Sequence, residues 1–467
     1  MAFMARVHAF TNDALGTLDA VGVAEAIQRR ALSSSEVVEA AIARVERVDP
    51  ELGAMAYRTF DRARLEARGP RRGFFAGVPT VIKDNVDVAG VPTRHGTDAY
   101  VARPARRNGA LTQMLMKMGL VSLGKSQLSE YGFSGSAEHP RLGAVRCPWD
   151  TSRIAGASSA GAGALVAAGA VPLAHGNDGG GSIRIPASVN GLVGLKPTRG
   201  RIAQDRFFQV LPVRIVADGV LTRSVRDTAA YLREAEKIHR DLSLPPVGDV
   251  VGPGRRLRVA VFTAALGRSA SPEVTALTLK TAALLEELGH AVEQVEVPVP
   301  QTLPEDFVLY WGSLALAIAS SGPLRGRTWD PTKLDNLTRG LADHCRRNLH
   351  HLPGAVRRLR AIEPLVEEFH ATYDVVLTPT VAHETPRLGH LAPTADYETV
   401  MGRLMDWVAF TPLQNVTGGP AISLPLQTTA AGLPQGMMFG AARGQEPTLL
   451  ELAFELEQAS PFPTLAD

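Results

Sequence analysis

Glycine, alanine and serine dominate the stretch GASSAGAGALVAAGAVPLAHGNDGGGSIRIPASVNGLVGLKPTRGRI, residues Gly156 to Ile202. The side chains of its first part, 156–170, are too small for an amphipathic surface helix. They fit a helix that is buried against a sheet, where backbones approach closely. Further along, three glycines lead directly into Ser182. Glycines that merely permit tight packing or positive φ are one interpretation of this run. Features elsewhere in the chain decide whether they also build a site.

Strand-like and helix-like segments alternate on both sides of this stretch. Residues 77–90 and 119–127 are apolar runs typical of strands, and 111–119 between them has helical periodicity. The same alternation recurs at 257–263, 275–297 and 373–380, and the chain closes with two strands and a helix at 418–426, 432–441 and 447–458. This pattern predicts an α/β sheet with crossover connections.

The first sixty residues are expected to be helical. Ser33-Ser34-Ser35-Glu36 is a capping-box sequence, and apolar residues then recur at helical spacing until Asp49-Pro50, where the helix is expected to stop. Residues 243–256 are rich in Pro and Gly, which fits either a surface loop between two lobes or a domain linker.

Composition excludes several classes of protein. A chain of 467 residues can bury a large core, and its 49 basic and 47 acidic residues nearly cancel, with no basic block for nucleic acid. Two cysteines make no disulfide framework, which favours a reducing compartment. The first residues lack the apolar core of a signal peptide, and no apolar run reaches the roughly 20 residues of a membrane helix. We therefore expect a cytoplasmic protein with neither a membrane nor a nucleic-acid partner.

Two binding hypotheses fail on motif detail. The glycine-rich segments match neither the P-loop order nor the dinucleotide fingerprint. The cluster of His344, Cys345, His350 and His351 has no common zinc spacing, so no metal is expected. His95 and His175 lie near the glycine-rich segments and are expected to be structural.

Three features gather here that packing does not require. Lys83 lies in the apolar run TVIKDNV, Ser158 and Ser159 form a pair among small residues, and Ser182 follows the glycines. A serine hydroxyl needs a base, and a buried neutral lysine can serve as one. Moving a lysine pKa from about 10.4 to about 7 requires roughly 4–5 kcal/mol of environmental bias. Successive backbone N–H groups of the glycine run could form an oxyanion hole.

The stretch 156–202, together with GVPTVIKDN (77–85), DVVLTPT (374–380) and GLPQGM (432–437), resembles the amidase signature hydrolases over almost the whole chain. The resemblance implies an α/β fold with a large twisted mixed β-sheet core flanked by helices on both faces. It implies one domain over 1–467, made of an N-terminal helical segment (1–70), a signature core (71–242) and a second lobe that completes the sheet and covers the pocket (257–460).

The resemblance also implies roles for individual residues. Ser182 is the nucleophile, Ser158 the bridging serine after a cis peptide bond, and Lys83 the base; the separation 182 − 158 = 24 matches the family motif. The backbone N–H groups of Gly179, Gly180, Gly181 and Ser182 form the oxyanion hole. Supporting groups are Ser159, Asp178 and Arg184. No cofactor is implied.

This chain departs from the common motif at several positions. Ala157 and Ala160 replace glycines, and Asn177-Asp178-Gly179 replaces Thr-Asp-Thr or Thr-Asp-Ile. The variant is similar to the branch with actinobacterial amidases, nylon-oligomer hydrolases and urethane-cleaving enzymes. It implies an amidase or urethanase for small apolar or aryl amides and carbamates, acting through an acyl-enzyme as a monomer or homodimer. The alternatives are a glutamine-hydrolysing amidotransferase subunit and a non-catalytic binding protein.

Candidate pocket residues lie outside the glycine-rich stretch. Tyr131, Gly132 and Phe133 fall where the family lines its acyl pocket, although the two aromatic residues could equally be core residues. Further apolar candidates, for most of which helical core packing is the favoured interpretation, are Trp311, Met405, Trp407 and Phe410.

Overall fold

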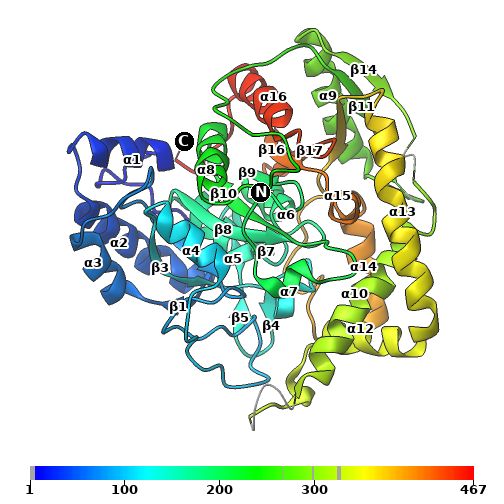
Figure 1. Cartoon of the computed structure of the whole chain (residues 1–467), viewed down its shortest axis with the longest axis horizontal. Coiled ribbons are helices and arrows are strands. Elements are labelled where there is room, and N and C mark those ends of the chain that lie inside the picture. The colour runs from blue at the N-terminus through cyan, green and yellow to red at the C-terminus, as the bar shows by residue number, and fades with distance from the viewer. Residues whose placement is uncertain (1–5, 266, 297–298, 323–327, 467) are drawn as a thin grey trace.

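The structure is a computed structural model that describes residues 6–265, 267–296, 299–322 and 328–466 (Figure 1). Its helices are α1 (Ala20–Gln28), α2 (Ser34–Leu52), α3 (Phe60–Arg68), α4 (Ala110–Lys117), α5 (Ala160–Ala167), α6 (Arg184–Asn190), α7 (Arg206–Gln209), α8 (Val225–Ile238), α9 (Pro272–Glu287), α10 (Leu303–Ser320), α12 (Asn336–Arg347), α13 (Leu352–His370), α14 (Tyr397–Trp407), α15 (Pro412–Thr417) and α16 (Glu446–Ala459), with short 3₁₀ turns η1 (Glu130–Gly132), η2 (Pro331–Lys333) and η3 (Leu349–His351).

The strands are β1 (Met55–Arg58), β2 (Pro79–Lys83), β3 (Val121–Ser126), β4 (Glu138–His139), β5 (Gly143–Ala144), β6 (Arg146–Cys147), β7 (Asp150–Ile154), β8 (Leu173–Asp178), β9 (Val193–Lys196), β10 (Ala217–Thr222), β11 (Arg258–Val261), β12 (Ala264–Ala265), β13 (Arg268–Ser269), β14 (Ala291–Gln294), β15 (Val375–Pro379), β16 (Ala421–Thr428) and β17 (Pro434–Ala441).

An eight-stranded sheet forms the centre of the molecule, in the order β14-β11-β15-β17-β16-β9-β10-β8. β11 is parallel to β14 and β15, and the other neighbouring strands are antiparallel, so the sheet is mixed. Every residue of β8, β9, β10, β15 and β17 is buried. Because successive side chains point to opposite faces, complete burial means that both faces of these strands are covered. The predicted α/β class is confirmed.

The Pro- and Gly-rich segment 243–256 connects α8 to β11. Strands from both sides of this segment, β8 to β10 before it and β11 onward after it, enter the same eight-stranded sheet. Leu244 and Val247 within the segment are buried. It therefore runs as a packed loop between two parts of one sheet.

A smaller sheet of three strands, in the order β1-β3-β2, carries Lys83 at the end of β2. The predicted strand–helix–strand unit is present, since β2 and β3 are parallel and α4 connects them. The expectation of helices alone before residue 60 missed β1, which pairs with β3. β2 lies beside β8, the edge strand of the large sheet, and Thr80 Oγ1 donates to the Leu173 carbonyl at 3.1 Å. Lys83 therefore lies at a junction between two sheets.

Helix α2 begins as predicted and ends later than predicted. Ser33 and Glu36 form the capping box. The helix continues through Pro50 to Leu52 and ends at Gly53, which adopts a left-handed conformation with φ of +62°. The proline is tolerated here because few residues follow it in the helix, and the Asp49 carboxylate accepts the N–H groups of Ala54 and of the following residue.

Helix α5 is buried along its whole length, as its small residues predict. A Cβ atom at Gly161 would lie 2.4 Å from the Ala54 carbonyl oxygen and 2.7 Å from the Gln127 backbone nitrogen. Only glycine permits this approach of the helix to neighbouring backbone. The approach fixes the start of α5, where Ser158 and Ser159 lie.

Helices α10, α12 and α13 form a layer along one side of the molecule (Figure 1). α10 packs against both α12 and α13, and α12 packs against α14. Trp311 and neighbouring apolar residues of α10 face the cavity described below. Among the described residues, no helix is long and apolar enough to cross a membrane.

Candidate active site

The structure brings together the three residues that the sequence singled out. Lys83 ends β2, Ser158 precedes α5, and Ser182 lies in the turn between β8 and α6. The distance from Lys83 Nζ to Ser158 Oγ is 2.7 Å, and the Ser158 backbone N–H donates to Ser182 Oγ at 3.2 Å. All three side chains are buried. Their chemical roles stay predictions.

The hydrogen bonds around Lys83 Nζ orient its lone pair. Asn177 Oδ1, at 2.6 Å, can only accept, so it takes one N–H of a neutral amine. Ser159 Oγ lies 3.0 Å from Nζ and donates its own hydrogen to the Asn177 carbonyl oxygen, so it takes the second N–H. The remaining lone pair faces Ser158 Oγ. This is the arrangement in which a neutral lysine can accept a proton from Ser158.

Burial also favours the neutral form of Lys83. The side chain is fully buried, and the resulting desolvation lowers the pKa of Lys83 to about 7. The charges of Asp218 and Asp178 oppose this effect by stabilising the ammonium form. Near neutral pH, a substantial fraction of the amine is therefore able to act as a base.

The glycine turn presents backbone N–H groups beside Ser182, although not all of those predicted. The Gly181 N–H donates to Asp178 Oδ1 at 2.7 Å, so the prediction that it lines the oxyanion hole was wrong. The reason is the position of the Asp178 carboxylate, which Arg184 holds beside this N–H. Within the described part of the chain, the N–H groups of Gly179, Gly180 and Ser182 have no protein acceptor. These three residues line the cavity.

A buried ion pair holds this turn in place. Arg184 donates from Nε and Nη2 to the two Asp178 oxygens, each at 2.9 Å. Arg184 also donates to the Thr411 carbonyl and to Asn415 Oδ1, and Thr411 Oγ1 donates to the Gly180 carbonyl. Burial would raise the pKa of Asp178, but Arg184 and Asn415 hold it well below its usual range. The turn is thus tied to α15.

The backbone at Ser158 differs from the implied geometry. All peptide bonds of the described residues are trans, so the cis bond expected before Ser158 is absent and that expectation was wrong. A trans bond is favoured by about 3 kcal/mol for a residue other than proline. From this trans backbone, Ser158 contacts both Lys83 and Ser182.

A cavity of about 380 Å³ opens beside Ser182. Tyr131, Gly132 and Phe133 line it, as predicted from their position in the sequence. Most of its other lining side chains are apolar: Ile185, Phe207, Phe208, Ile215, Val216, Trp311, Leu314, Ile318, Leu404 and Val408. Polar groups are fewer and include Asn85, Asp87, His95 and Asp205. The cavity therefore fits a ligand that is largely apolar.

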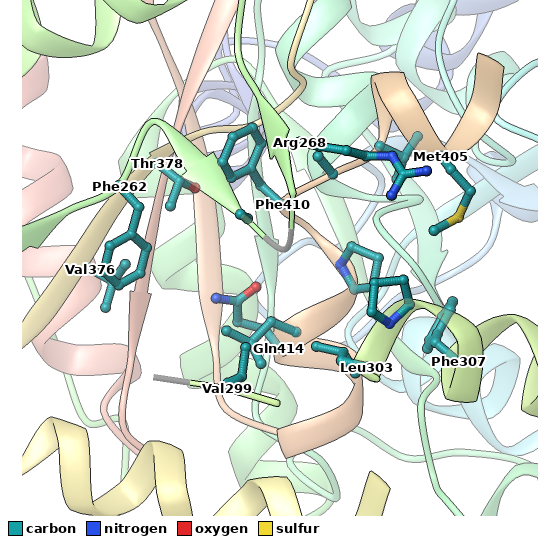
Figure 2. Close-up of a pocket in the computed structure, with 16 residues that line it drawn as sticks. Phe262, Arg268, Val299, Leu303, Phe307, Val376, Thr378, Met405, Phe410 and Gln414 are labelled. Atoms are coloured by element: carbon teal, nitrogen blue, oxygen red, sulfur yellow. The ribbon is translucent and has the colours of Figure 1, made fainter. Parts of the chain in front are cut away.

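Three of the four other apolar candidates fall outside this cavity. Met405 and Phe410 line a separate cavity of about 50 Å³, into which Phe307 also points (Figure 2). Phe307 separates it from the glycine turn before Ser182, since a Cβ atom on Gly180 would lie 3.6 Å from the Phe307 ring. Trp407 is buried in the core and donates to the His383 carbonyl. Of the four candidates, Trp311 alone lines the cavity beside Ser182.

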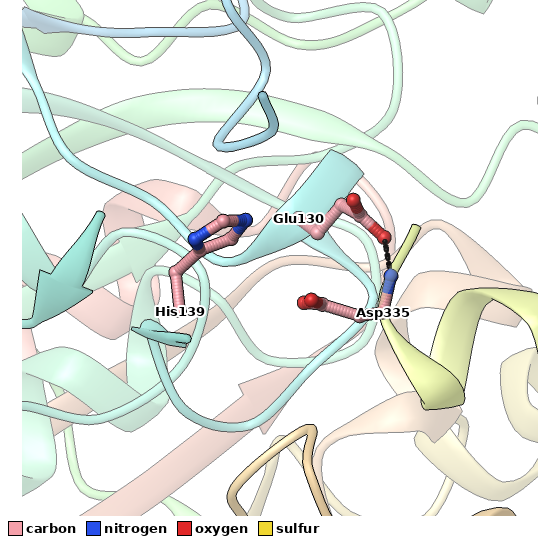
Figure 3. A group of neighbouring side chains, drawn as sticks. All are labelled: Glu130, His139 and Asp335. Carbon is pink, nitrogen blue, oxygen red and sulfur yellow. Dashed lines mark hydrogen bonds between the residues drawn. The ribbon is translucent and has the colours of Figure 1, made fainter. Parts of the chain in front are cut away.

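A cluster of Glu130, His139 and Asp335 is the one group of three possible metal-ligating side chains among the described residues (Figure 3). His139 Nδ1 accepts the N–H groups of Arg141 and Leu142, so the imidazole proton is on Nε2 and no lone pair faces the carboxylates. Glu130 accepts the Asp335 N–H at 2.8 Å and thereby ties η1 to the start of α12. The contact between Glu130 and Asp335 holds η1, which carries the cavity-lining residues Tyr131 and Gly132. The donor chemistry of the cluster does not favour a metal.

Sequence reasoning missed two contacts of β8 with Lys83. Asn177 accepts from Lys83 Nζ, and His175, expected to be only structural, accepts the Lys83 backbone N–H at 3.2 Å. Their spacing of two places both on one face of the strand, and this period was the available signal. His95 stacks on Tyr131 with ring centroids 5.6 Å apart and lines the cavity.

The comparisons with known proteins agree on one family. Residues 36–450 match the family model described as Amidase. The chain is 62% identical over 462 residues to "Putative amidase AmiC" of Mycobacterium leprae (strain TN), covering 98% of each chain. It resembles the structure of 6-aminohexanoate cyclic dimer hydrolase with a TM-score of 0.86 and 33% identity, covering 97% and 98% of the chains. It also resembles a bacterial aryl acylamidase with a TM-score of 0.85 and 26% identity, covering 95% and 96%.

Proposed function

The chain belongs to the amidase signature family of amide hydrolases, and we propose that it cleaves the C–N bond of small apolar or aryl amides and carbamates through an acyl-enzyme on Ser182. The observation that carries the proposal is the buried Lys83 Nζ, which lies 2.7 Å from Ser158 Oγ, while the Ser158 backbone N–H donates to Ser182 Oγ at 3.2 Å. This arrangement supplies a base, a proton carrier and a nucleophile without a metal ligand or a histidine.

The proposed reaction begins with two proton transfers. Neutral Lys83 takes the proton of Ser158 while Ser158 takes that of Ser182, and Ser182 Oγ forms a bond to the carbonyl carbon. The oxyanion accepts the free N–H groups of Gly179, Gly180 and Ser182. The C–N bond then breaks, and the proton returns through Ser158 to the leaving nitrogen. Water repeats the cycle on the ester and releases the acid.

A carbamate reacts by the same first steps as an amide, but the covalent intermediate that is hydrolysed differs. Loss of the amine leaves an alkyl or aryl carbonate on Ser182, and its hydrolysis yields carbon dioxide, free Ser182 and an alcohol or a phenol. The same base and the same oxyanion donors serve both substrates, since the attacked group is a carbonyl bonded to nitrogen in each.

The walls of the cavity support an apolar substrate over glutamine. The aromatic and aliphatic residues around Ser182 offer no partner for a primary carboxamide or an amino-acid headgroup along most of the surface. This argues against the amidotransferase alternative. The non-catalytic alternative would leave the free N–H groups and the oriented amine without a purpose.

A substrate panel tests this proposal. Anilides, aliphatic amides, aryl carbamates, esters and glutamine are compared by kcat/KM, and a fluorophosphonate probe reports covalent reaction at Ser182 by intact mass. We expect the highest values for anilides and aryl carbamates, and one label per chain. Hydrolysis of esters alone, or of glutamine alone, would overturn the proposed substrate class.

Activity should fall in acid because the base must be neutral. Burial lowers the pKa of Lys83 to about 7, so below that pH the protonated fraction grows as pH decreases. We expect kcat/KM to decline about tenfold per unit well below pH 7 and to level off above about pH 8. A profile of kcat/KM against pH on an anilide measures this limb. A rate independent of pH across the neutral range would contradict the assignment of Lys83.

Trp311 is expected to affect binding more than chemistry. It lines the cavity from α10 and its ring packs 6.0 Å from that of Phe133. Trp311→Ala removes apolar contact made in both ground and transition states, so KM for an aryl substrate should rise about tenfold with kcat little changed. Steady-state kinetics measure both constants. Leu349→Ala is the control, because Leu349 is half exposed on η3 and does not line the cavity. A fall in kcat alone would contradict a pocket role.

A further inference from the structure

His175 bridges the junction between the two sheets. It lies on β8 of the large sheet and is fully buried, and its Nδ1 accepts the backbone N–H of Lys83, on the small sheet, at 3.2 Å. Its Nε2 lies 3.1 Å from Asp218 Oδ1 on β10. The second Asp218 oxygen accepts from Gln204 Nε2 at 2.9 Å. One chain of hydrogen bonds thus runs from Gln204 to the strand that carries the base.

The bond to the Lys83 backbone fixes the tautomer of His175. Because Nδ1 accepts an N–H, the proton of the neutral ring must lie on Nε2, which donates it to Asp218. Burial lowers the pKa of His175, which keeps the ring neutral. Asp218 then accepts hydrogen bonds at both oxygens, as a carboxylate does, and is 2% exposed.

We propose that Asp218 is a positioning residue for Lys83, which it holds in place through His175 while directing a buried negative charge at the base. This inference rests on the proposed function, in which Lys83 accepts the proton of Ser158. It assigns a role in the reaction to a histidine and an aspartate that, among the described residues, form no hydrogen bond with Ser158 or Ser182.

The charged and titratable groups around this chain define the electrostatic balance. Lys83 faces two carboxylates, Asp218 and Asp178. His175 faces Asp218, Lys83 and a second buried lysine, Lys125, which is itself paired with Asp84 at 2.9 Å. The Tyr231 hydroxyl faces Asp218 from α8, and burial and that charge raise its pKa. Removing the charge of Asp218 leaves Asp178 as the remaining carboxylate that opposes desolvation of Lys83.

The sign of the effect follows from this balance. A nearby negative charge favours the ammonium form, so the Asp218 carboxylate raises the pKa of Lys83 against the larger, lowering effect of burial. Asp218→Asn keeps the size of the side chain and an acceptor for His175 Nε2, but removes the charge. Lys83 should then stay neutral to lower pH, and the acid limb of the reaction should move in the acid direction.

The experiment measures the rate of Ser182 labelling by a fluorophosphonate as a function of pH, which requires no knowledge of the natural substrate. We expect the midpoint of the acid limb to lie about one pH unit lower in Asp218→Asn than in the wild type. Asp49→Asn, which removes the charge of another buried carboxylate that accepts two backbone N–H groups just after α2, should leave the midpoint unchanged.

A second variant separates position from charge. His175→Asn keeps an acceptor near the Lys83 N–H but cannot reach Asp218, so the charge remains while the bridge is broken. We expect the labelling rate on the plateau above the acid limb to fall about tenfold, because Lys83 is less well oriented. The midpoint of the acid limb should change little. Thermal unfolding of each variant shows whether the fold is intact. An unchanged plateau in folded His175→Asn would overturn the positioning role.

The outcomes distinguish this inference from the function it rests on. If wild-type Ser182 is labelled with an acid limb and folded Asp218→Asn has the same midpoint, the inference is wrong and the proposed function stands. If Ser182 is not labelled at all, the proposed function fails and the inference with it. Should Asp218→Asn not fold, ¹⁵N-histidine spectra of the wild type decide: the Nε2–H tautomer throughout neutral pH supports the bridge, and the Nδ1–H tautomer overturns it.

Discussion

Ser182→Ala should lower kcat/KM for any amide substrate by about 10⁴-fold or more and abolish labelling by a fluorophosphonate. The substitution removes the oxygen that forms the covalent bond, while the free N–H groups of the turn and the apolar walls remain and still bind substrate. KM should therefore change far less than kcat. Steady-state kinetics and intact mass after labelling measure both effects.

A buried serine elsewhere provides the control for this variant. Ser136 is 1% exposed, and its hydroxyl donates to Glu138 outside the cavity lining. Ser136→Ala should keep activity within about threefold, since it removes no group near the reacting carbonyl. Full hydrolysis by Ser182→Ala would show that another group is the nucleophile.

Lys83→Met should reduce kcat by about 10³-fold or more and remove the acid limb near pH 7 from whatever activity remains. Methionine is close to lysine in length and shape, so the space that the Lys83 side chain occupies stays filled, but no basic amine faces Ser158. The substrate still finds the pocket and the oxyanion donors. We therefore expect a large loss in kcat with a small change in KM, measured on an anilide over a range of pH.

The chain offers a matched control in Lys196. Its side chain is 1% exposed, and burial lowers its pKa to about 7 as well. Its Nζ donates to the Pro197 carbonyl and does not line the cavity. Lys196→Met removes an equally desolvated amine from another place and should retain activity. Equal losses in the two variants would mean that Lys83 matters for the fold and not for proton transfer.

Local sequence patterns predicted the elements whose cause is local. Apolar runs with turn residues at their ends predicted β2, β3, β11 and β15, and the capping box predicted the start of α2. The end of α2 was missed because a proline near a helix end depends on what caps the following residues. The Asp49 side chain supplies that cap by accepting a backbone N–H after the helix, and helix propensities of single residues do not predict such a contact.

Part of the candidate site was predictable from local sequence and part was not. The spacing of Ser158 and Ser182, and Lys83 in an apolar strand, singled out three residues that the fold does bring together. Which N–H groups of the turn remain free was not predictable, because the loss of the Gly181 donor depends on where the Asp178 carboxylate lies. The set of N–H groups left free for the proposed oxyanion hole depends on that orientation as much as on the glycines.

By itself the sequence determined the family, the α/β class and the candidate site residues, because these follow from residue type and spacing along the chain. The tertiary structure decided the surroundings of Lys83. Its lone pair is aimed by Asn177 and Ser159, and its backbone is held by His175 across the junction of two sheets. These partners lie 76 to 94 positions away along the chain. Only folding brings such groups within hydrogen-bond distance, and burial in the folded core is what favours the neutral form of the amine.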